Sequence, residues 1–402
     1  MRLDEARSRS QEKDICMDAK KRKYPGHLQD SAEYAAGRNN MNQEYELNIN
    51  PLPAKTWNWL HMNETSVKAP ALLENGTVEQ TVPSSVAYRT ASENEADAVF
   101  SEIQTGMGDE MDDFLKNGDT ELRVYTTKSQ TAEKQPLVLN FTYGTDRHTA
   151  NRLAFHLLPG SELTVLMDFS AETESDGMAA IQTKVYAEEG AVLHLVQVQR
   201  LATGFTFYND IGTKCGKNAR VETIQLVLGG KNTYLGSRTA LEGESSALSS
   251  DVGYLVGANE HLDMNFVAYH TGKKTESRMD ASGVLRENGF KLFRGTIDFR
   301  KGCAGAVGNE KEDVLLLDDA VVNQTIPLIL CEEEDVEGNH GATIGKLDEE
   351  LLFYLESRGM SEEAVYEMMA RARIDAIAGK IPDAGMREKI RAYLGDVQDE
   401  EK

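Results

Sequence analysis

The chain has 402 residues, and its 66 acidic residues outnumber its 43 basic ones, which gives a formal net charge of -23 at pH 7. A surface this negative repels phosphate backbones and no basic stripe compensates for it, so nucleic acid is not expected as a partner. No apolar run is long enough to span a bilayer, and the first 24 residues lack a signal-peptide core, which predicts a soluble cytoplasmic protein.

The four cysteines are far apart in the sequence and form no Cys-x-x-Cys pair: Cys16, Cys215, Cys303 and Cys331. This spacing argues against a zinc ribbon and against a self-sufficient ferredoxin-type cluster site. Sparse cysteines are typical of a reducing compartment, which agrees with the cytoplasmic prediction.

The N-terminal third is predicted to contain an arm followed by a small domain. Residues 1–45 are polar and of mixed charge, which predicts a loosely helical arm. Residues 46–130 form the predicted N-terminal domain, where two prolines precede Trp57 and Trp59. Within this domain, residues 92–118 predict a helix from apolar residues at helical spacing and a final glycine, namely Ala98, Phe100, Ile103, Met107 and Gly118.

From about Leu122 the sequence changes to the alternation of apolar and polar residues that is typical of strands. These segments recur about every 20 to 30 residues without an intervening helix, which predicts an all-β body. A sandwich, a propeller and a solenoid are the candidate folds, and the near-equal spacing favours a parallel β-helix over residues 131–337. The clearest strand patterns lie at residues 163–172, 191–201, 220–230 and 261–271.

Residues 338–402 are predicted to form a C-terminal helical domain. Asp348 is placed to cap a first helix that stops at Gly359, and Ser361 is placed to cap a second helix that runs to Gly379. A third, shorter helix is expected over residues 385–394. The segment just before these helices, with the sequence GNHGATIGKL, is expected to be a compact turn that holds His340.

This glycine-rich segment looks like a phosphate loop, as does GTKCGKN at residues 212–218. A Walker A loop needs four residues between its first glycine and the Gly-Lys pair, followed by Ser or Thr. Both segments have only three intervening residues, and Leu347 and Asn218 follow their lysines. Neither segment is therefore expected to bind a nucleotide.

No sequence motif singles out a catalytic centre. There is no Gly-x-Ser-x-Gly elbow and no His-Glu-x-x-His helix, and the eight histidines are scattered without ligand spacing. His340 lies among small residues, where both a structural role and a functional role are open. Cys331, at the end of an apolar strand pattern, is by local context a small core residue.

The C-terminal part of the chain resembles a known family. The segment VEGNHGATIGKLDEELLFYLESRGMSEEAVYEMM, residues 336–369, is similar to the C-terminal signature of the SufB/SufD family of iron–sulfur cluster assembly scaffolds. Upstream, NPLPAKTWNWLHMNET is similar to the Pro-x-x-x-Trp segment near the N-terminus of that family. The resemblance implies a mainly β fold, a right-handed parallel β-helix flanked by an N-terminal α/β segment and a C-terminal helical tail.

Two departures from the SufB pattern make SufD the more similar branch. SufB members carry a functional cysteine at a place that, counted back from Pro327, falls near Glu312 in this chain and not on a cysteine, and they read His-Glu-Ala where this chain has His340-Gly341-Ala342. The resemblance to SufD implies a scaffold subunit and not an enzyme. It implies pairing with a SufB-like paralogue along the β-helix edge, and docking of the SufC-like ABC-type ATPase by the helical tail.

The resemblance also assigns roles to individual residues. It implies that His340 lies at the partner interface, where nascent cluster is handled and where the imidazole is a candidate iron ligand. Cys331 and Glu312 are weaker candidates for the same interface. The candidate ATPase-docking residues are Tyr354, Met368 and Met369.

For cofactors, the resemblance implies none bound stably by the isolated chain, a transient iron–sulfur cluster at the partner interface, and an open question about flavin. A homodimer is expected when the chain is alone. Two alternatives stay open: a SufB-like scaffold that itself holds nascent cluster, and a carbohydrate-active β-helix enzyme. The second alternative would require a secretion signal and a charged groove, which the sequence does not indicate.

Overall fold

The computed structural model describes residues 44–56, 60–70, 73–91, 98–118, 120–171 and 174–400, with side chains described up to residue 395. The predicted polar arm lies outside the described residues except for its last two positions, and so do Cys16, Trp57 and Trp59. None of the helices that the structure describes is both long and apolar enough to span a bilayer.

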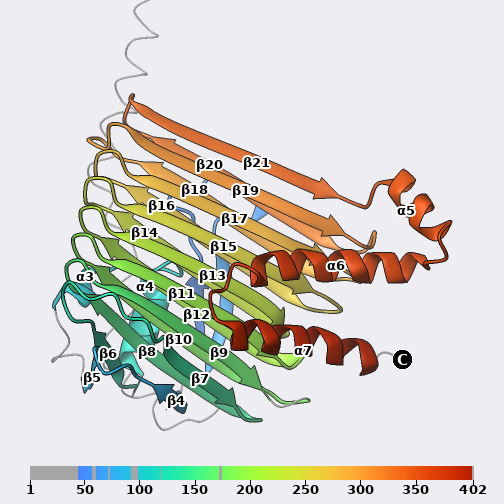
Figure 1. Ribbon diagram of the computed structural model, residues 1–402, viewed down its shortest axis with the longest axis horizontal. Coiled ribbons are helices and arrows are strands. Elements are labelled where there is room, and N and C mark those ends of the chain that lie inside the picture. The colour runs from blue at the N-terminus through green and yellow to red at the C-terminus, as the bar shows by residue number, and fades with distance from the viewer. Residues whose placement is uncertain are drawn as a thin grey trace, which may run out of the picture. The chain divides into compact units, whose positions relative to one another are not determined.

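The N-terminal segment combines short strands with two described helices (Figure 1). Its elements are β1 (Glu44–Ile49), β2 (Thr65–Pro70), β3 (Glu74–Asn75), β4 (Val78–Thr81), β5 (Ala87–Ala91), α3 (Ala98–Glu102) and α4 (Asp109–Asn117). The single helix expected at residues 92–118 is therefore interrupted. Between the two helices the Gly106 N–H donates to the Ile211 carbonyl at 3.2 Å instead of to a carbonyl one helical turn earlier, and a Cβ at residue 106 would lie 1.9 Å from the backbone nitrogen of Ser237. Gly118 ends α4 as predicted.

Two long sheets of mostly parallel strands form the body of the protein. Sheet 1 contains β3 and β5 of the N-terminal segment together with β6 (Leu122–Thr126), β8 (Arg147–Leu157), β10 (Asp176–Ala187), β12 (Gly204–Cys215), β14 (Asn232–Leu241), β16 (His261–His270), β18 (Phe290–Phe299) and β20 (Val322–Cys331). Sheet 2 contains β4 with β7 (Leu137–Tyr143), β9 (Glu162–Ala171), β11 (Val192–Leu201), β13 (Arg220–Gly229), β15 (Ala247–Val256), β17 (Glu276–Leu285), β19 (Ala306–Leu316) and β21 (Val336–Gly345).

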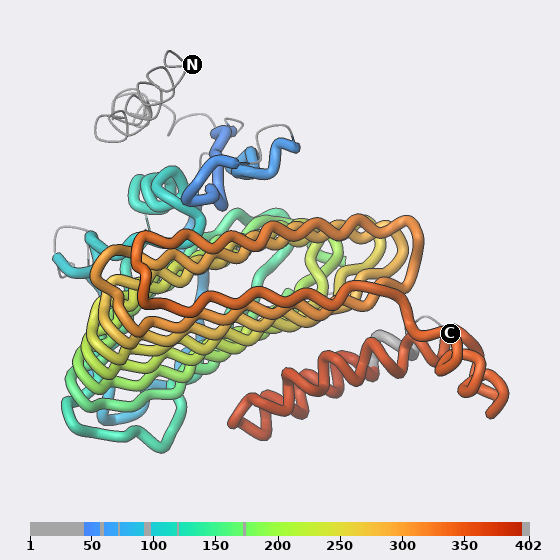
Figure 2. The backbone as a smooth tube through the Cα atoms, turned by 90° about the horizontal axis from the view of Figure 1, so that it is seen from above, coloured from blue at the N-terminus to red at the C-terminus, as the bar shows by residue number. Residues whose placement is uncertain are grey.

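The chain alternates between the two sheets, so that each pair of strands makes one coil stacked on the coil before it (Figure 2). In sheet 1, Thr206 pairs with Asn232 and Phe290 pairs with Val322, so one coil takes between 26 and 32 residues. This arrangement is the predicted parallel β-helix. The four clearest predicted strands coincide with β9, β11, β13 and β16 to within one residue at each end.

Alternate side chains of both sheets fill the interior of the coils with apolar groups. Phe141 and Phe169 stack with ring centroids 5.1 Å apart, and Phe207 reaches Phe169 from the opposite sheet at 5.0 Å. Each of these rings is fully buried, because a coil above and a coil below cover it. Stacked aromatic side chains in successive coils therefore hold the middle of the β-helix together.

The N-terminal segment packs on the outer face of sheet 1 through a buried polar centre at Asp263. Its carboxylate accepts hydrogen bonds from Asn50 Nδ2 at 2.8 Å and from Thr65 Oγ1 at 2.5 Å. Arg294 Nη1 donates to the same carboxylate at 2.6 Å, and its Nε donates to the Met62 carbonyl at 2.7 Å. Because the charges of Asp263 and Arg294 are paired, both side chains can be buried in the folded chain. The same hydrogen bonds attach the N-terminal segment to the coils.

Three helices follow the last strand: α5 (Glu349–Glu356), α6 (Glu362–Ala378) and α7 (Ala384–Glu400). The predicted caps are confirmed, since Asp348 accepts from the backbone of Glu350 and Leu351, and Ser361 accepts from the backbone of Ala364. Gly359, at φ +91°, ends the first helical unit in a conformation that suits glycine. Helix α7 is longer than the predicted 385–394.

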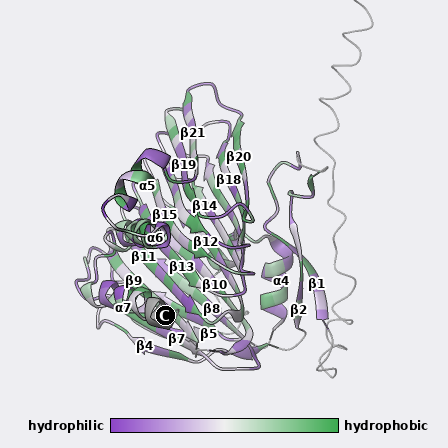
Figure 3. Cartoon of the chain, turned by 90° about the vertical axis from the view of Figure 1, so that its right-hand side faces the viewer, coloured by the Kyte–Doolittle hydropathy of each residue, from purple (hydrophilic) through white to green (hydrophobic). Residues whose placement is uncertain are grey.

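Helices α6 and α7 lie on the outer face of sheet 2, on the other side of the coils from β1, β2 and α4 (Figures 2 and 3). Their apolar side chains, among them Ile374, Ile377 and Ile390, pack on Leu166 and Val198 of the sheet. Ion pairs flank this contact, from Arg373 to Asp313, from Lys380 to Asp251 and from Lys389 to Asp168.

The expected turn around His340 is not a turn. Residues 336–345 form β21, which pairs with β19 along its whole length, so the predicted boundary between residues 337 and 338 falls inside a strand. The small residues suggested a turn, but backbone hydrogen bonds to the strand one coil earlier stabilise them as an edge strand. The other lookalike of a phosphate loop begins in β12, so it too is largely strand.

Candidate functional site

The last coil, formed by β20 and β21, is the end of both sheets in the described part of the chain. Its inward-facing side chains occupy the positions that earlier coils bury, yet Ile329 of β20 is 40% exposed and Ile344 of β21 is 43% exposed. Strand β21 is exposed or half-buried along its whole length. An apolar interior face beside two unpaired strand edges has the properties of an interaction surface. We call this surface the open end.

His340 lies in the middle of β21 at an inward-facing position of the open end. It pairs in register with Glu310 of β19, and its Nδ1 lies 3.5 Å from Oε1 of that residue. The His340 side chain is 25% exposed, whereas the Glu310 side chain is fully buried. The imidazole therefore forms a boundary between a buried carboxyl group and the exterior.

Glu310 is unusual because its carboxyl group is buried without a hydrogen-bond partner in the described part of the chain. Burial raises the pKa of Glu310 from 4.5 to about 8, and the nearby charge of Glu312 adds to this effect, while Lys291 opposes it. A carboxyl group with this pKa is mainly protonated at neutral pH.

Glu312 lies two residues further along β19 and has partners of its own. It forms a fully buried ion pair with Lys291 of β18, and it accepts a hydrogen bond from Thr325 Oγ1 at 2.7 Å. Lys291 also donates to Thr325 at 3.0 Å. Burial lowers the pKa of Lys291 despite the attraction of Glu312, and burial together with the charge of Glu312 raises the pKa of Tyr254. The carboxylate of Glu312 is thus held in a buried ion pair.

The cysteines do not gather at His340. Cys331 is exposed at the end of β20, and its thiol donates to the Glu333 carbonyl at 3.0 Å. It lies in sheet 1, whereas His340 lies in sheet 2, and Cys215 and Cys303 are buried elsewhere in the coils. Among the described residues, no group of three or more His, Cys, Asp and Glu side chains is arranged to hold a metal ion.

A second exposed apolar surface lies on the C-terminal helices. Tyr354 of α5 is 52% exposed, and its ring stacks on the Arg358 guanidinium at 5.1 Å. Met368 of α6 is 41% exposed, and Phe353 of α5 is 72% exposed. We call these three exposed side chains the helix patch. Met369 differs, since it packs toward the buried side of α6.

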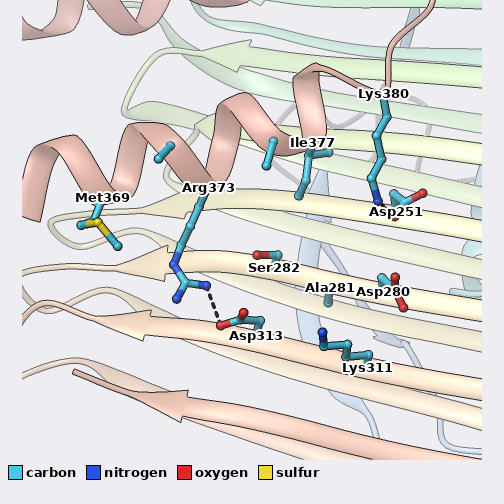
Figure 4. Close-up of a pocket in the computed structure, with 12 residues that line it drawn as sticks. Asp251, Asp280, Ala281, Ser282, Lys311, Asp313, Met369, Arg373, Ile377 and Lys380 are labelled. Atoms are coloured by element: carbon cyan, nitrogen blue, oxygen red, sulfur yellow. Dashed lines mark hydrogen bonds and ion pairs between the residues drawn. The ribbon is translucent and has the colours of Figure 1, made fainter. Parts of the chain in front are cut away.

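A groove of about 420 Å³ runs between α6 and sheet 2 (Figure 4). Its walls carry charged side chains, among them Asp313 and Arg373, which pair across it, and the apolar side chains of Met369 and Ile377. The two walls belong to elements already joined by the ion pairs described above.

Sequence reasoning missed Glu310 and Lys291, which complete the environment of His340 and Glu312. The spacing of Glu310 and His340 could have revealed their contact. Glu310 precedes His340 by the length of one coil, and both occupy inward-facing positions of their strands. Phe353, the most exposed apolar side chain of the helix patch, was also missed. It lies beside Tyr354 in the same segment.

Comparison with known proteins identifies relatives of the chain. Residues 141–373 match the family model described as SUF system FeS cluster assembly, SufBD core domain. The chain is 27% identical over 199 residues to the iron-sulfur cluster assembly protein SufB of Bacillus subtilis, covering 50% of this chain and 43% of that protein. It is 24% identical over 228 residues to SufD of Bacillus subtilis, covering 56% and 52% respectively.

A further relative is SufD of Escherichia coli, with 23% identity over 275 residues, covering 67% of this chain and 64% of that protein. The matched regions therefore span less than two thirds of the length of each of these three relatives. The match to the SufBD core extends over more than half of the chain and covers the end of β7, the strands from β8 to β21, α5 and most of α6. The chain belongs to the SufB/SufD family of iron–sulfur cluster assembly proteins.

Proposed function

We propose that this chain is a SufD-like scaffold subunit of the SUF system, which pairs through its open end with a SufB-like paralogue. The observation that carries this proposal is the exposure of the last coil. Ile329 and Ile344 occupy interior positions that a further coil would cover, and no described strand pairs with the outer edges of β20 and β21, so these edges can pair with another chain. The same surface supports a homodimer when the paralogue is absent.

The environment of Glu312 favours a SufD-like role over a SufB-like one. The resemblance puts the functional cysteine of SufB near this position, and here the Glu312 side chain forms a buried ion pair with Lys291. A carboxylate held in this way cannot accept sulfur as a thiolate would. The relatives do not decide the question, since the identities to SufB and SufD are similar.

His340 is the residue through which the chain would take part in cluster assembly. Its side chain reaches the surface of the open end, so a docked partner would cover it and the nascent cluster, as cargo, would lie between the two chains. Cys331 is exposed at the same end, in the other sheet. Iron ligation by His340 and any association with flavin stay predictions.

The helix patch is the proposed docking surface for a SufC-like ABC-type ATPase. Phe353, Tyr354 and Met368 expose large apolar side chains on the helices that follow β21 in the chain. Aromatic and methionine side chains adapt well to a partner surface. Met369 contributes to packing of α6 and not to this contact. In this scheme the chain is a cytoplasmic, non-enzymatic subunit, and no observation favours a carbohydrate-active enzyme.

Co-expression with a SufB-like paralogue and a SufC-like ATPase tests the proposal. All three chains should co-purify with the unmodified protein. Ile344→Arg should abolish retention of the paralogue while leaving that of the ATPase, and Phe353→Arg should do the reverse. Each variant is thus the control for the other, and unchanged thermal unfolding would show that both are folded. If neither chain co-purifies with the unmodified protein, the proposal is wrong.

The SufB-like alternative has a separate test. The purified chain alone would be incubated anaerobically with ferrous iron and sulfide, desalted, and examined by visible absorbance. We expect no cluster absorbance above that of a Cys331→Ser control. A cluster that survives desalting and depends on Cys331 would replace the SufD-like proposal with the SufB-like one.

A further inference from the structure

We propose that Glu310 is a positioning residue for His340. The Glu310 carboxyl group binds Nδ1 of the imidazole from inside the coil and thereby directs Nε2 out of the open end toward the docked partner. The functional meaning of this contact rests on the proposed function, whereas the contact itself can be tested without it. The two residues come from neighbouring strands one coil apart and face the same interior.

The site for Glu310 is built into the interior of the last coils. Across from it, β18 carries Gly295, where a Cβ would lie 2.3 Å from the Glu310 carboxyl carbon. Any side chain at residue 295 would therefore displace the carboxyl group. The missing side chain of Gly295 and the full burial of Glu310 together fix the carboxyl group beneath β21.

The neighbouring charged groups are already engaged, which leaves the imidazole as the partner of Glu310. Lys291 pairs with Glu312, and Thr325 donates to that same carboxylate. Among the described residues, His340 is the cationic or potentially cationic group recorded within 4 Å of Glu310. A buried carboxyl group without a hydrogen bond is unfavourable, so closing the 3.5 Å contact with the ring is the available way to satisfy it.

The contact fixes the orientation of the ring in either protonation state. A protonated carboxyl group donates to Nδ1, and a carboxylate accepts from Nδ1–H. In both arrangements Nδ1 is engaged inside the coil, and Nε2, on the other side of the ring, is left for the partner. The hydrogen bond made by one ring nitrogen sets the state of the other, so Glu310 determines what His340 presents at the interface.

Nuclear magnetic resonance of the full-length chain, with nitrogen-15 in its histidines, tests the contact directly. The His340 signals would be assigned by their loss in His340→Gln, and spectra recorded at one neutral pH. The test variant is Glu310→Leu, which fills the site without a polar group. Glu310→Gln is the conservative variant, and Glu337→Gln, an exposed carboxylate on β21, is the matched control.

In the unmodified protein the ratio of the two His340 tautomers should differ by about tenfold or more from that in Glu310→Leu, as expected for a hydrogen bond to a buried carboxyl group. Glu310→Gln should retain part of the preference, because its amide can still bond to Nδ1, and Glu337→Gln should leave the ratio unchanged. Identical His340 nitrogen shifts in Glu310→Leu and the unmodified protein would overturn the proposal.

A second measurement separates this inference from the proposed function. In the co-expressed complex, Glu310→Leu should leave co-purification of the paralogue intact and lower the rate of cluster formation, with no further loss when combined with His340→Gln. If the resonance result holds but no complex forms, the proposed function fails and the contact stands. If the complex forms but the tautomer ratio does not change, the positioning role fails alone.

Discussion

The middle coils and the last coil follow the same alternating pattern, yet they differ in what covers them. Phe169 of β9 and Ile329 of β20 both face the interior, but Phe169 is fully buried and Ile329 is 40% exposed. The difference arises because a coil lies on each side of β9, whereas β20 ends its sheet in the described chain. Interior-type side chains on an uncovered coil mark the place where a β-helix protein can accept a partner.

The same comparison holds for the two buried carboxylates of β19. Glu312 is neutralised by Lys291 and Thr325 in the manner of an internal ion pair. Glu310, directly beneath the exposed strand, has no such partners and faces His340. Among the described residues, the first is thus held by a cation and a hydroxyl group, whereas the second has the imidazole of His340 as its nearest recorded partner.

The largest expected effect contrasts an interior side chain in the middle with one at the open end. Phe169→Ala should lower the free energy of unfolding by about 3 to 5 kcal/mol, because it removes a ring packed between two others. Ile329→Ala should cost less than about 1 kcal/mol, since much of its side chain is already solvated. Urea unfolding of both variants checks this contrast. Equal losses would mean that the last coil is covered in the free chain.

Removing the partner of Glu312 and removing the carboxyl group of Glu310 should have opposite effects on stability. Lys291→Met leaves Glu312 as an uncompensated buried charge, which should cost about 3 to 5 kcal/mol. Glu310→Leu removes a buried carboxyl group whose recorded contact among the described residues is the 3.5 Å approach to His340 Nδ1, so it should be close to neutral or stabilising. Urea midpoints at neutral pH would measure both. A large loss of stability in Glu310→Leu would contradict this prediction, because it would mean that the Glu310 carboxyl group makes a strong stabilising interaction in the unmodified protein.

The raised pKa of Glu310 predicts a pH dependence. Between pH 4.5 and about 8 the folded chain keeps a proton that the unfolded chain releases, so stability should fall as the pH rises through this range. Glu310→Gln does not bind this proton. As the pH rises, its free energy of unfolding should therefore increase relative to that of the unmodified protein, by up to about 1.4 kcal/mol per pH unit.

Unfolding curves of the two proteins across this range provide the measurement. Other buried acids with raised pKa values, Asp210 at about 6 and Glu260 at about 7, act in the same direction and are present in both proteins. They therefore cancel in the difference. Curves that stay parallel across the range would contradict the burial of an unpaired carboxyl group at residue 310.

The smallest expected effect concerns the outer face of sheet 2. The ion pair of Arg373 with Asp313 is partly exposed, so Arg373→Ala should cost no more than about 1 kcal/mol, and less at high salt. Asp313→Asn should give a similar loss, and the double variant little more than either. Thermal unfolding at two salt concentrations would check this. A salt-independent loss of several kcal/mol would mean that the groove beneath α6 is more closed than its ion pairs indicate.

Local chemistry explains what could be predicted in advance. The helix caps at Asp348 and Ser361 and the stop at Gly359 depend on neighbouring residues only, and they were confirmed. The strands of the middle coils were predicted because both interior and exterior positions are marked by alternation. The segment of His340 was misjudged because its small residues resemble a turn, and its strand conformation depends on β19, one coil away.

The sequence by itself determined the fold class, the strands of the middle coils, the caps of the C-terminal helices, and the family, because these follow from periodicity, capping residues and a local signature. The tertiary structure alone decided which interior side chains are uncovered, which of two nearby carboxylates has a partner, and what lies beneath His340. Those properties depend on residues about 30 positions apart that stacking brings into register, and on whether a further coil covers them. No local pattern encodes either condition.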